Sequence, residues 1–138
     1  MVLTSERIFV NLPVKDLKRS IDFFTALGFE FNKQFTDDKA GCLVIGSNIF
    51  AMLVTEPFFR TFTSKPIVDA AAATEAIIAL SASSREQVDE VVSKALASGG
   101  SPANDKQDHG FMYTGSFHDP DGHMWEIMYM EPGTVEEA

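Results

Sequence analysis

The fold is decided by one stretch of the chain, Phe111-Met112-Tyr113-Thr114-Gly115-Ser116-Phe117-His118-Asp119-Pro120-Asp121-Gly122-His123-Met124-Trp125-Glu126-Ile127-Met128-Tyr129-Met130. Two runs rich in aromatic and other strand-forming residues flank the four-residue break at 119–122. Proline suits the second position of a turn, and glycine suits a position that needs a positive φ angle. The stretch is therefore predicted to be a β-hairpin.

Symmetric pairing about this turn would place His118 opposite His123 and Gly115 opposite Glu126. Because side chains alternate along a strand, one face would then carry Phe117, Gly115, Tyr113, Met124, Glu126 and Met128. A single carboxylate among large apolar groups is a candidate for chemistry or binding. The alternative is a half-buried strand whose glutamate is solvated at a sheet edge.

Length and composition indicate one globular domain, 1–138. The net charge of −9 argues against nucleic acid and anionic membranes as partners, since both would repel the chain. The single cysteine, Cys42, lies in an apolar run and is predicted to be a buried thiol in a reducing compartment. No signal pattern and no membrane-spanning window is present, so we expect a cytoplasmic protein.

The chain repeats one order of elements. Module one, about 8–55, begins with a strand at 8–12 and a helix that Asp16 caps and Gly28 ends. Three strands are predicted to follow, at 29–35, 41–45 and 49–55. A linker at 56–75 is predicted to contain a helical turn, and its Phe58, Phe59 and Phe62 should cover apolar surface.

Module two, about 76–130, begins with a strand at 76–81 and a helix capped by Ser83 or Ser84 and stopped at Gly99-Gly100. The hairpin completes it, with a short strand possible within 101–108. The predicted fold class is α+β, with two βαβββ modules.

These residues carry a family resemblance. The quoted motifs are Asn11-Leu12-Pro13-Val14-Lys15-Asp16-Leu17, Phe23-Phe24, Leu27-Gly28-Phe29 and Asp119-Pro120-Asp121-Gly122-His123-Met124-Trp125-Glu126. With the paired modules, they resemble the vicinal oxygen chelate superfamily of glyoxalase I, extradiol dioxygenases, fosfomycin-resistance enzymes and bleomycin-binding proteins. The resemblance spans about 8–130 and implies that the two modules form a curved, cup-shaped mixed sheet with helices on its convex side. Segments 8–17, 53–59 and 107–113 look like the bacterial subgroup of predicted lactoylglutathione lyases.

The resemblance implies a metal ligand on each of four strands, at positions that fall on Phe9, Met52, Ile77 and Glu126. Only Glu126 can ligate a divalent ion, so we expect no metal cofactor. The alternative is a divalent metal with Glu126 as one ligand and the other donors from loops. Two further histidine sites are weaker candidates: His118 and His123 beside Asp119, and the loop residue His109.

We therefore predict a metal-free protein that binds or sequesters a small molecule, mainly apolar or aromatic, with any positive charge of the ligand meeting Glu126. The alternatives are a lactoylglutathione lyase-like or dioxygenase-like enzyme, in which Glu126 is the catalytic base or ligand, and a cup that is simply core. By resemblance, and because of the phenylalanines in the linker, a homodimer is expected. The predicted cup is lined by Phe9, Asn11, Phe50, Met52, Ile77, Ala79, Tyr113, Phe117, Met124, Glu126 and Met128.

Overall fold

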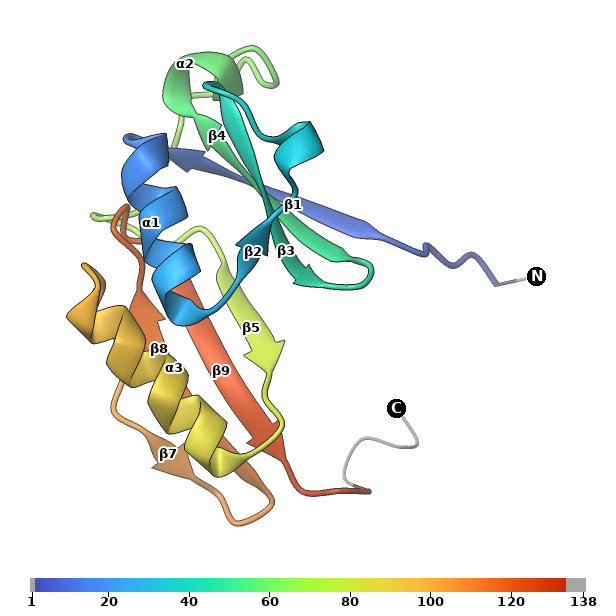
Figure 1. The fold of residues 1–138 in the computed structure, drawn as a ribbon, viewed down its shortest axis with the longest axis vertical. Helices are drawn as coiled ribbons and strands as arrows, with labels where there is room; N and C mark the ends of the chain where they lie inside the picture. Colours follow the sequence, from blue (N-terminus) through green and yellow to red (C-terminus); the bar gives the residue numbers. More distant parts are fainter. Residues whose placement is uncertain (1, 134–138) are drawn as a thin grey trace. The chain divides into compact units, whose positions relative to one another are not determined.

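The computed structural model describes residues 2–133 of the predicted domain, so Met1 and 134–138 lie outside the description. The chain divides into two compact units, Met1–Val68 and Asp69–Ala138, and the division falls inside the predicted linker. We call them module one and module two, and each is described by itself. Figure 1 shows that each combines a mixed sheet with one long helix.

Module one has the sheet order β1-β4-β3-β2, in which β1 is parallel to β4 and the other neighbours are antiparallel. The helix α1 packs against β3 and β4. Its elements are β1 (Ile8–Val14), α1 (Leu17–Leu27), β2 (Glu30–Phe31), the 3-10 helix η1 (Lys33–Phe35), β3 (Ala40–Gly46), β4 (Ile49–Thr55) and the short helix α2 (Glu56–Phe59).

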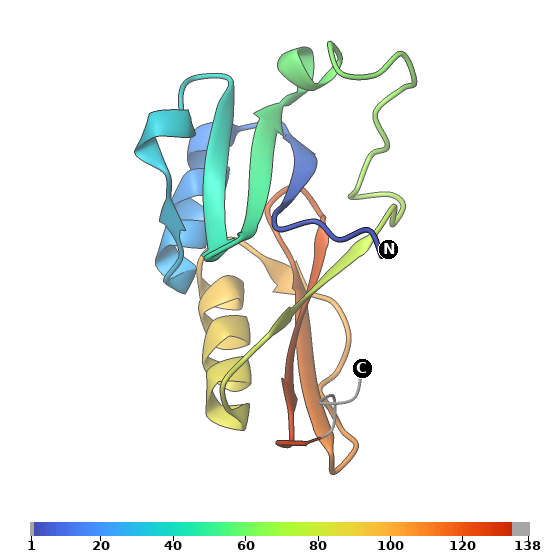
Figure 2. The same ribbon diagram turned by 90° about the vertical axis from the view of Figure 1, so that its right-hand side faces the viewer.

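Module two repeats this topology with the order β5-β9-β8-β6, and β7 pairs with β8. The first and last strands, β5 and β9, are again parallel. The helix α3 lies along one face of this sheet (Figure 2). Its elements are β5 (Ile77–Ser81), α3 (Arg85–Ala97), β6 (Ser101–Pro102), β7 (Gln107–Asp108), β8 (Met112–His118) and β9 (Met124–Met130).

Both long helices begin where the sequence predicts. The Asp16 carboxylate accepts a hydrogen bond from the backbone N–H of Arg19, and the Ser84 hydroxyl accepts one from the N–H of Gln87. Each satisfies a donor that a first helical turn leaves unpaired. Gly28 ends α1 in the left-handed region, at φ 110°. The α+β class, with two mixed sheets and few helices, is confirmed.

One predicted strand of module one is wrong. The segment 29–35 forms only the two-residue β2 and then η1. The reason is Asn32, whose side-chain oxygen accepts a hydrogen bond from the N–H of Gln34 at 3.0 Å. This local bond offers the backbone an alternative to the sheet ladder.

The register of the β8–β9 hairpin also differs from the prediction. His118 pairs with Met124, and Glu126 pairs with Ser116 instead of Gly115. The cause is a three-residue loop: Asp119 N–H donates to His123 O at 2.9 Å, and Gly122 at the third loop position has φ 95°. A type I turn followed by a left-handed residue closes such loops. The slip by one residue sends every β8 side chain to the other face.

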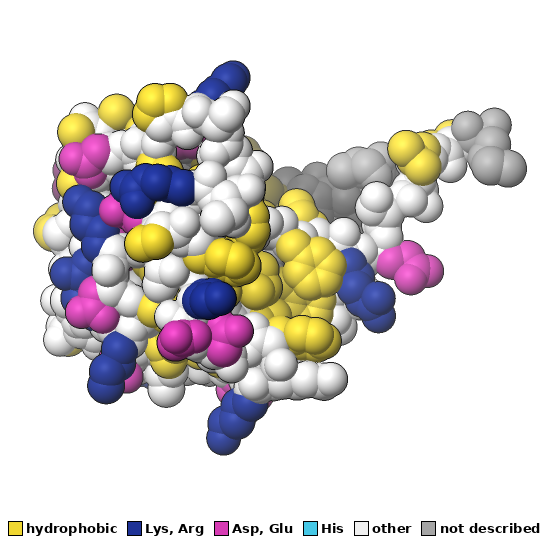
Figure 3. All heavy atoms as spheres, turned by 90° about the horizontal axis from the view of Figure 1, so that it is seen from above, with side chains coloured by type: hydrophobic (Ala, Val, Ile, Leu, Met, Phe, Trp, Pro, Cys, Tyr) yellow, Lys and Arg dark blue, Asp and Glu magenta, His cyan; other side chains and the backbone are white. Residues whose placement is uncertain are grey.

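Each module has its own buried side chains. Phe23, Phe24 and Leu53 are almost fully buried in module one, and Phe117 and Trp125 in module two. Other large apolar side chains lie at the surface among charged groups (Figure 3). No helix within residues 2–133 is both long and apolar enough to cross a bilayer.

Candidate functional site

The candidate site lies on the face of the module-two sheet opposite α3. A Cβ atom placed on Gly115 would meet Val88 and Val92 of α3, so odd-numbered β8 residues point at the helix. The opposite face, which we call the Glu126 face, has no helix of its own module packed on it among the described residues. It consists of Ile77, Ala79 and Ser81 on β5, Met112, Thr114, Ser116 and His118 on β8, and Met124, Glu126, Met128 and Met130 on β9.

Glu126 is half-buried at the centre of this face. Ser116 and Ala79 flank it on the neighbouring strands, and Met124 and Met128 flank it along β9. No described residue donates a hydrogen bond to its carboxylate or forms an ion pair with it. The Ser116 hydroxyl does not supply one, because it accepts from Asn104 N–H at 2.9 Å and donates to Asn104 O at 3.4 Å. The carboxylate oxygens are therefore available to a ligand.

Four of the predicted cup residues share this face with Glu126: Ile77, Ala79, Met124 and Met128. Two do not. Tyr113 and Phe117 lie on the α3 side of the sheet, because of the register shift, and their predicted position beside Glu126 is wrong. The Tyr113 hydroxyl donates to Asp89 of α3 at 2.6 Å, and Phe117 is 1% exposed.

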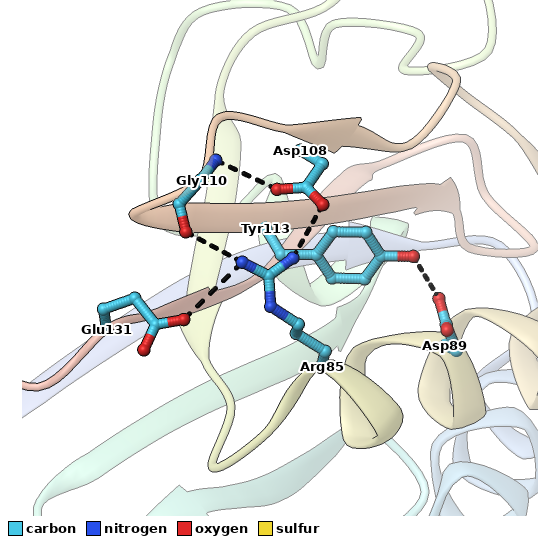
Figure 4. A network of polar contacts seen from close by, with 6 residues as sticks. All are labelled: Arg85, Asp89, Asp108, Gly110, Tyr113 and Glu131. Carbon is cyan, nitrogen blue, oxygen red and sulfur yellow. Dashed lines mark hydrogen bonds and ion pairs between the residues drawn. The ribbon is translucent and has the colours of Figure 1, made fainter.

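Tyr113 belongs to a polar network that ties α3 to the hairpin (Figure 4). The Arg85 guanidinium lies 2.9 Å from Asp108 Oδ2 and 3.6 Å from Glu131 Oε1. It also donates to Gly110 O and lies over the Tyr113 ring. The hydrogen bond to Asp89 raises the pKa of Tyr113, and the Gly110 N–H and Arg85 lower the pKa of Asp108. These side chains have partners within the fold, so we assign them a structural role.

The turn carboxylate Asp119 is likewise structural. Its Oδ1 accepts from the N–H groups of Asp121 and His123, and its Oδ2 accepts from the Trp125 indole, all at 3.0 Å. Burial raises the pKa of Asp119, against the opposing effect of His123. These bonds hold the three-residue loop closed.

Module one also has a sheet face that α1 does not cover. It carries Phe9, Asn11, Phe50 and Met52, which the sequence placed together in the cup. The Phe9 and Phe50 rings stack with centroids 5.0 Å apart, and Phe9 is 52% exposed. Cys42 lies opposite Met52, and burial raises the pKa of its thiol, which disfavours a reactive thiolate.

The three histidines lie on different segments of module two: the end of β8, the turn after it and the loop after β7. His118 is on the Glu126 face, and His123 lies at the Asp119 turn. His109 is exposed in its loop, where Nε2 is 3.2 Å from Gln107 Oε1. Within residues 2–133, no group of three His, Cys, Asp or Glu side chains is arranged to hold a metal ion.

The residues at the four implied ligand positions do not fit a divalent metal. Phe9, Met52 and Ile77 offer a ring, a thioether and a hydrocarbon, whereas Zn, Mn or Fe sites need several nitrogen, oxygen or thiolate donors. Glu126 is the single suitable donor among the four. One carboxylate is too few donors to hold such an ion at these positions.

Sequence reasoning missed Met112, Thr114, Ser116 and His118 as members of the Glu126 face. The signal was present in Pro120-Asp121-Gly122, which also fits a three-residue loop with glycine in the last, left-handed position. Counting three loop residues instead of four gives the observed register.

Comparisons with known proteins agree with this architecture. Residues 8–127 match the family model of the Glyoxalase/Bleomycin resistance protein/Dioxygenase superfamily. No curated protein gives a significant match. A hypothetical protein from S. aureus has a similar structure, with a TM-score of 0.78 and 26% identity over 91% of this chain and 94% of that chain.

Two other solved structures have the same fold at lower identity. A glyoxalase/bleomycin resistance protein/dioxygenase family enzyme from Burkholderia phytofirmans PsJN has a TM-score of 0.75 and 14% identity, over 88% of this chain and 96% of that one. The fosfomycin resistance protein FosX from Listeria monocytogenes has a TM-score of 0.67 and 22% identity, over 99% and 97%. The family match covers most of the chain, and this protein therefore belongs to the glyoxalase/bleomycin resistance protein/dioxygenase superfamily.

Proposed function

We propose that this protein binds or sequesters a small, mainly apolar or aromatic molecule whose positively charged group pairs with Glu126. The observation that carries the proposal is the Glu126 carboxylate, half-buried and without a partner among the described residues. A carboxylate that has lost part of its hydration gains from a charged hydrogen-bond donor. Ile77, Met124 and Met128 supply apolar contact beside it.

The aromatic face of module one supports the same class of ligand. Phe9 and Phe50 stack beside Asn11 and Met52, a neutral and largely apolar group of side chains. Such a face suits an aromatic molecule better than a polar metabolite. We treat the faces as two binding surfaces and rest the proposal on Glu126.

The test is a binding titration with a panel of aromatic amines and their neutral alcohol counterparts, followed by NMR. We expect the amines to bind more tightly, and Glu126→Gln to weaken them about tenfold, the loss of about 1.4 kcal/mol, while the alcohols are unchanged. Glu86→Gln is the matched control, because Glu86 is an exposed carboxylate on α3, and α3 packs on the face of the sheet opposite Glu126.

Two results would contradict the proposal. One is a panel in which amines and alcohols bind equally well, or not at all. The other is purified protein that carries about one divalent metal ion per chain and loses it in Glu126→Ala, which would favour the metal-dependent lyase or dioxygenase-like alternative.

We also propose that the protein is a homodimer in a reducing, cytoplasmic compartment. Phe62 is 53% exposed, and its ring centroid lies 5.0 Å from that of Phe58. The helix α2 and the following turn therefore present an aromatic cluster that a second chain could cover. Light scattering should give twice the 15.2 kDa chain mass at micromolar concentration. A monomer mass would reject the dimer without affecting the Glu126 test.

A further inference from the structure

Methionines gather on the Glu126 face in a way that apolar packing does not require. The chain has six, and four of them, Met112, Met124, Met128 and Met130, lie on this one face of β8 and β9. Strands favour β-branched and aromatic side chains when only apolar surface is needed. What methionine adds is a flexible, polarizable thioether sulfur.

Three of these methionines are close together at one end of the face. Met112 pairs directly with Met130 across the hairpin, and Met128 is the next residue along β9 on the same side. Opposed residues have Cβ atoms roughly 4.5–5.5 Å apart, and alternate residues on a strand are separated by roughly 6.8 Å. Three long side chains at these separations can direct their sulfurs to one point.

The backbone at this end of the hairpin is held on both sides. The ladder continues past the Met112–Met130 pair, because Glu131 N–H donates to Phe111 O at 2.8 Å. Arg85 then binds both Glu131 and the Gly110 carbonyl. All three methionines remain partly exposed, so an ion from solvent can reach them.

We propose that Met112, Met128 and Met130 form a thioether site for a soft monovalent metal ion of the Cu(I) or Ag(I) class. Thioethers are soft, neutral donors that favour such ions over hard ions such as Mn or Mg. The nearby Glu126, two residues from Met128, adds negative charge that favours a cation. Met128 and Glu126 also belong to the surface proposed above for an organic ligand, but Met112 and Met130 do not, and the metal site requires no organic ligand.

The test uses Ag(I) alone, which is inert to redox change, with the full chain labelled at the methionine methyl groups. We expect Ag(I) to shift the methyl signals of Met112, Met128 and Met130. The signals of Met52 and Met124 serve as internal controls, and Met52 also reports binding at its cross-strand neighbour Cys42. Each of Met112→Leu, Met128→Leu and Met130→Leu should weaken binding about tenfold or more.

Leucine keeps the volume of the side chain, so these variants should fold, and Met124→Leu and Met52→Leu are the matched controls. Binding that survives in the triple variant would overturn the proposal. So would methyl shifts confined to Met52, because they would assign the ion to Cys42. A failure here leaves the amine titration untouched, so the two proposals fail separately.

Discussion

The two modules can be compared position by position, because the parallel strands have the same register in each. Phe9 pairs with Phe50 in module one as Ile77 pairs with Met124 in module two. The same alignment makes three pairs of positions equivalent: Gly41 with Gly115, Ala51 with Trp125, and Met52 with Glu126. The backbone pattern is retained, and the side chains differ on both faces.

On the helix-covered faces, the large side chains come from the helix in module one and from the sheet in module two. In module one the helix supplies Phe23 and Phe24, and the sheet position is Ala51. In module two the helix supplies Val88, Val92 and Ala95, and the sheet supplies Trp125. Close packing requires the summed volume to fill the layer, and a large side chain on either element can do so.

On the uncovered faces the difference is chemical. Module one has the Phe9–Phe50 stack and neutral Met52, whereas module two has methionines around the carboxylate of Glu126. A repeat can keep one backbone pattern and a filled core while its uncovered surface, which can meet ligands, changes in chemistry. The charged face is therefore the better candidate for specific recognition.

The largest effect is expected at Trp125. Its replacement by alanine should reduce the free energy of unfolding by about 3–5 kcal/mol, because it leaves a cavity and removes the indole donor from Asp119. Ala51→Gly at the equivalent position should cost about 1 kcal/mol. Urea unfolding followed by circular dichroism measures both. Equal losses in the free energy of unfolding would contradict the conclusion that the sheet supplies the large core side chain in module two.

The equivalent glycines give a sharper comparison. A Cβ on Gly115 would lie 2.9 Å from Val92 Cγ2 and 3.1 Å from Val88 Cγ1, so Gly115→Ala should cost about 1–3 kcal/mol. A Cβ on Gly41 would meet Phe31 at 3.3 Å and the flexible Leu17 side chain at 3.4 Å. We expect Gly41→Ala to cost less, and thermal unfolding of the two variants tests the order. A larger loss for Gly41→Ala would be inconsistent with α3 being the more closely packed helix.

The sequence predicts the repeated part of this fold well, because short-range signals determine it. Asp16, Gly28 and Ser84 mark the helix ends, and alternating apolar residues mark β4 and β9. It fails where one side chain competes with the backbone. Asn32 ends β2 early through its hydrogen bond to Gln34 N–H, and no pattern of hydrophobicity reports such a bond.

The candidate site could be predicted only in part for a related reason. Residues on β9 keep their face whatever the loop length, so Glu126, Met124 and Met128 were placed together correctly. Residues on β8 depend on whether the loop has three residues or four, so Tyr113 and Phe117 were placed on the wrong face. The Tyr113–Asp89 bond and the Arg85 network join distant segments, which no local signal reveals.

The helix caps should show where the modules behave alike. Asp16→Ala and Ser84→Ala each remove the acceptor of one backbone N–H, at 3.1 and 3.0 Å, and each should cost about 1 kcal/mol. Asp16→Asn and Ser84→Asp, which keep an acceptor, are the controls. Chemical unfolding measures the four variants. A loss of stability in only one module would show that the helix of the other module does not depend on its cap.

The smallest effect concerns the ion pair between Arg85 and Asp108, which joins α3 to β7. The folded-state pKa of Asp108 is lowered, first by the Gly110 N–H and then by Arg85. A lowered pKa means that the stabilisation is present above the unfolded value of about 3.9 and is lost as the pH falls through the folded value.

Asp108→Asn keeps an acceptor for Gly110 and removes the charge, so it should be slightly less stable than the unmodified chain at pH 7 and equal to it near pH 2. The difference should also shrink in 1 M NaCl, because both side chains are partly exposed. Thermal unfolding at the two pH values measures this, with Asp38→Asn in an exposed turn of module one as the control. A difference that persisted near pH 2 would assign the effect to the asparagine side chain and would remove the ion pair from the account of module two.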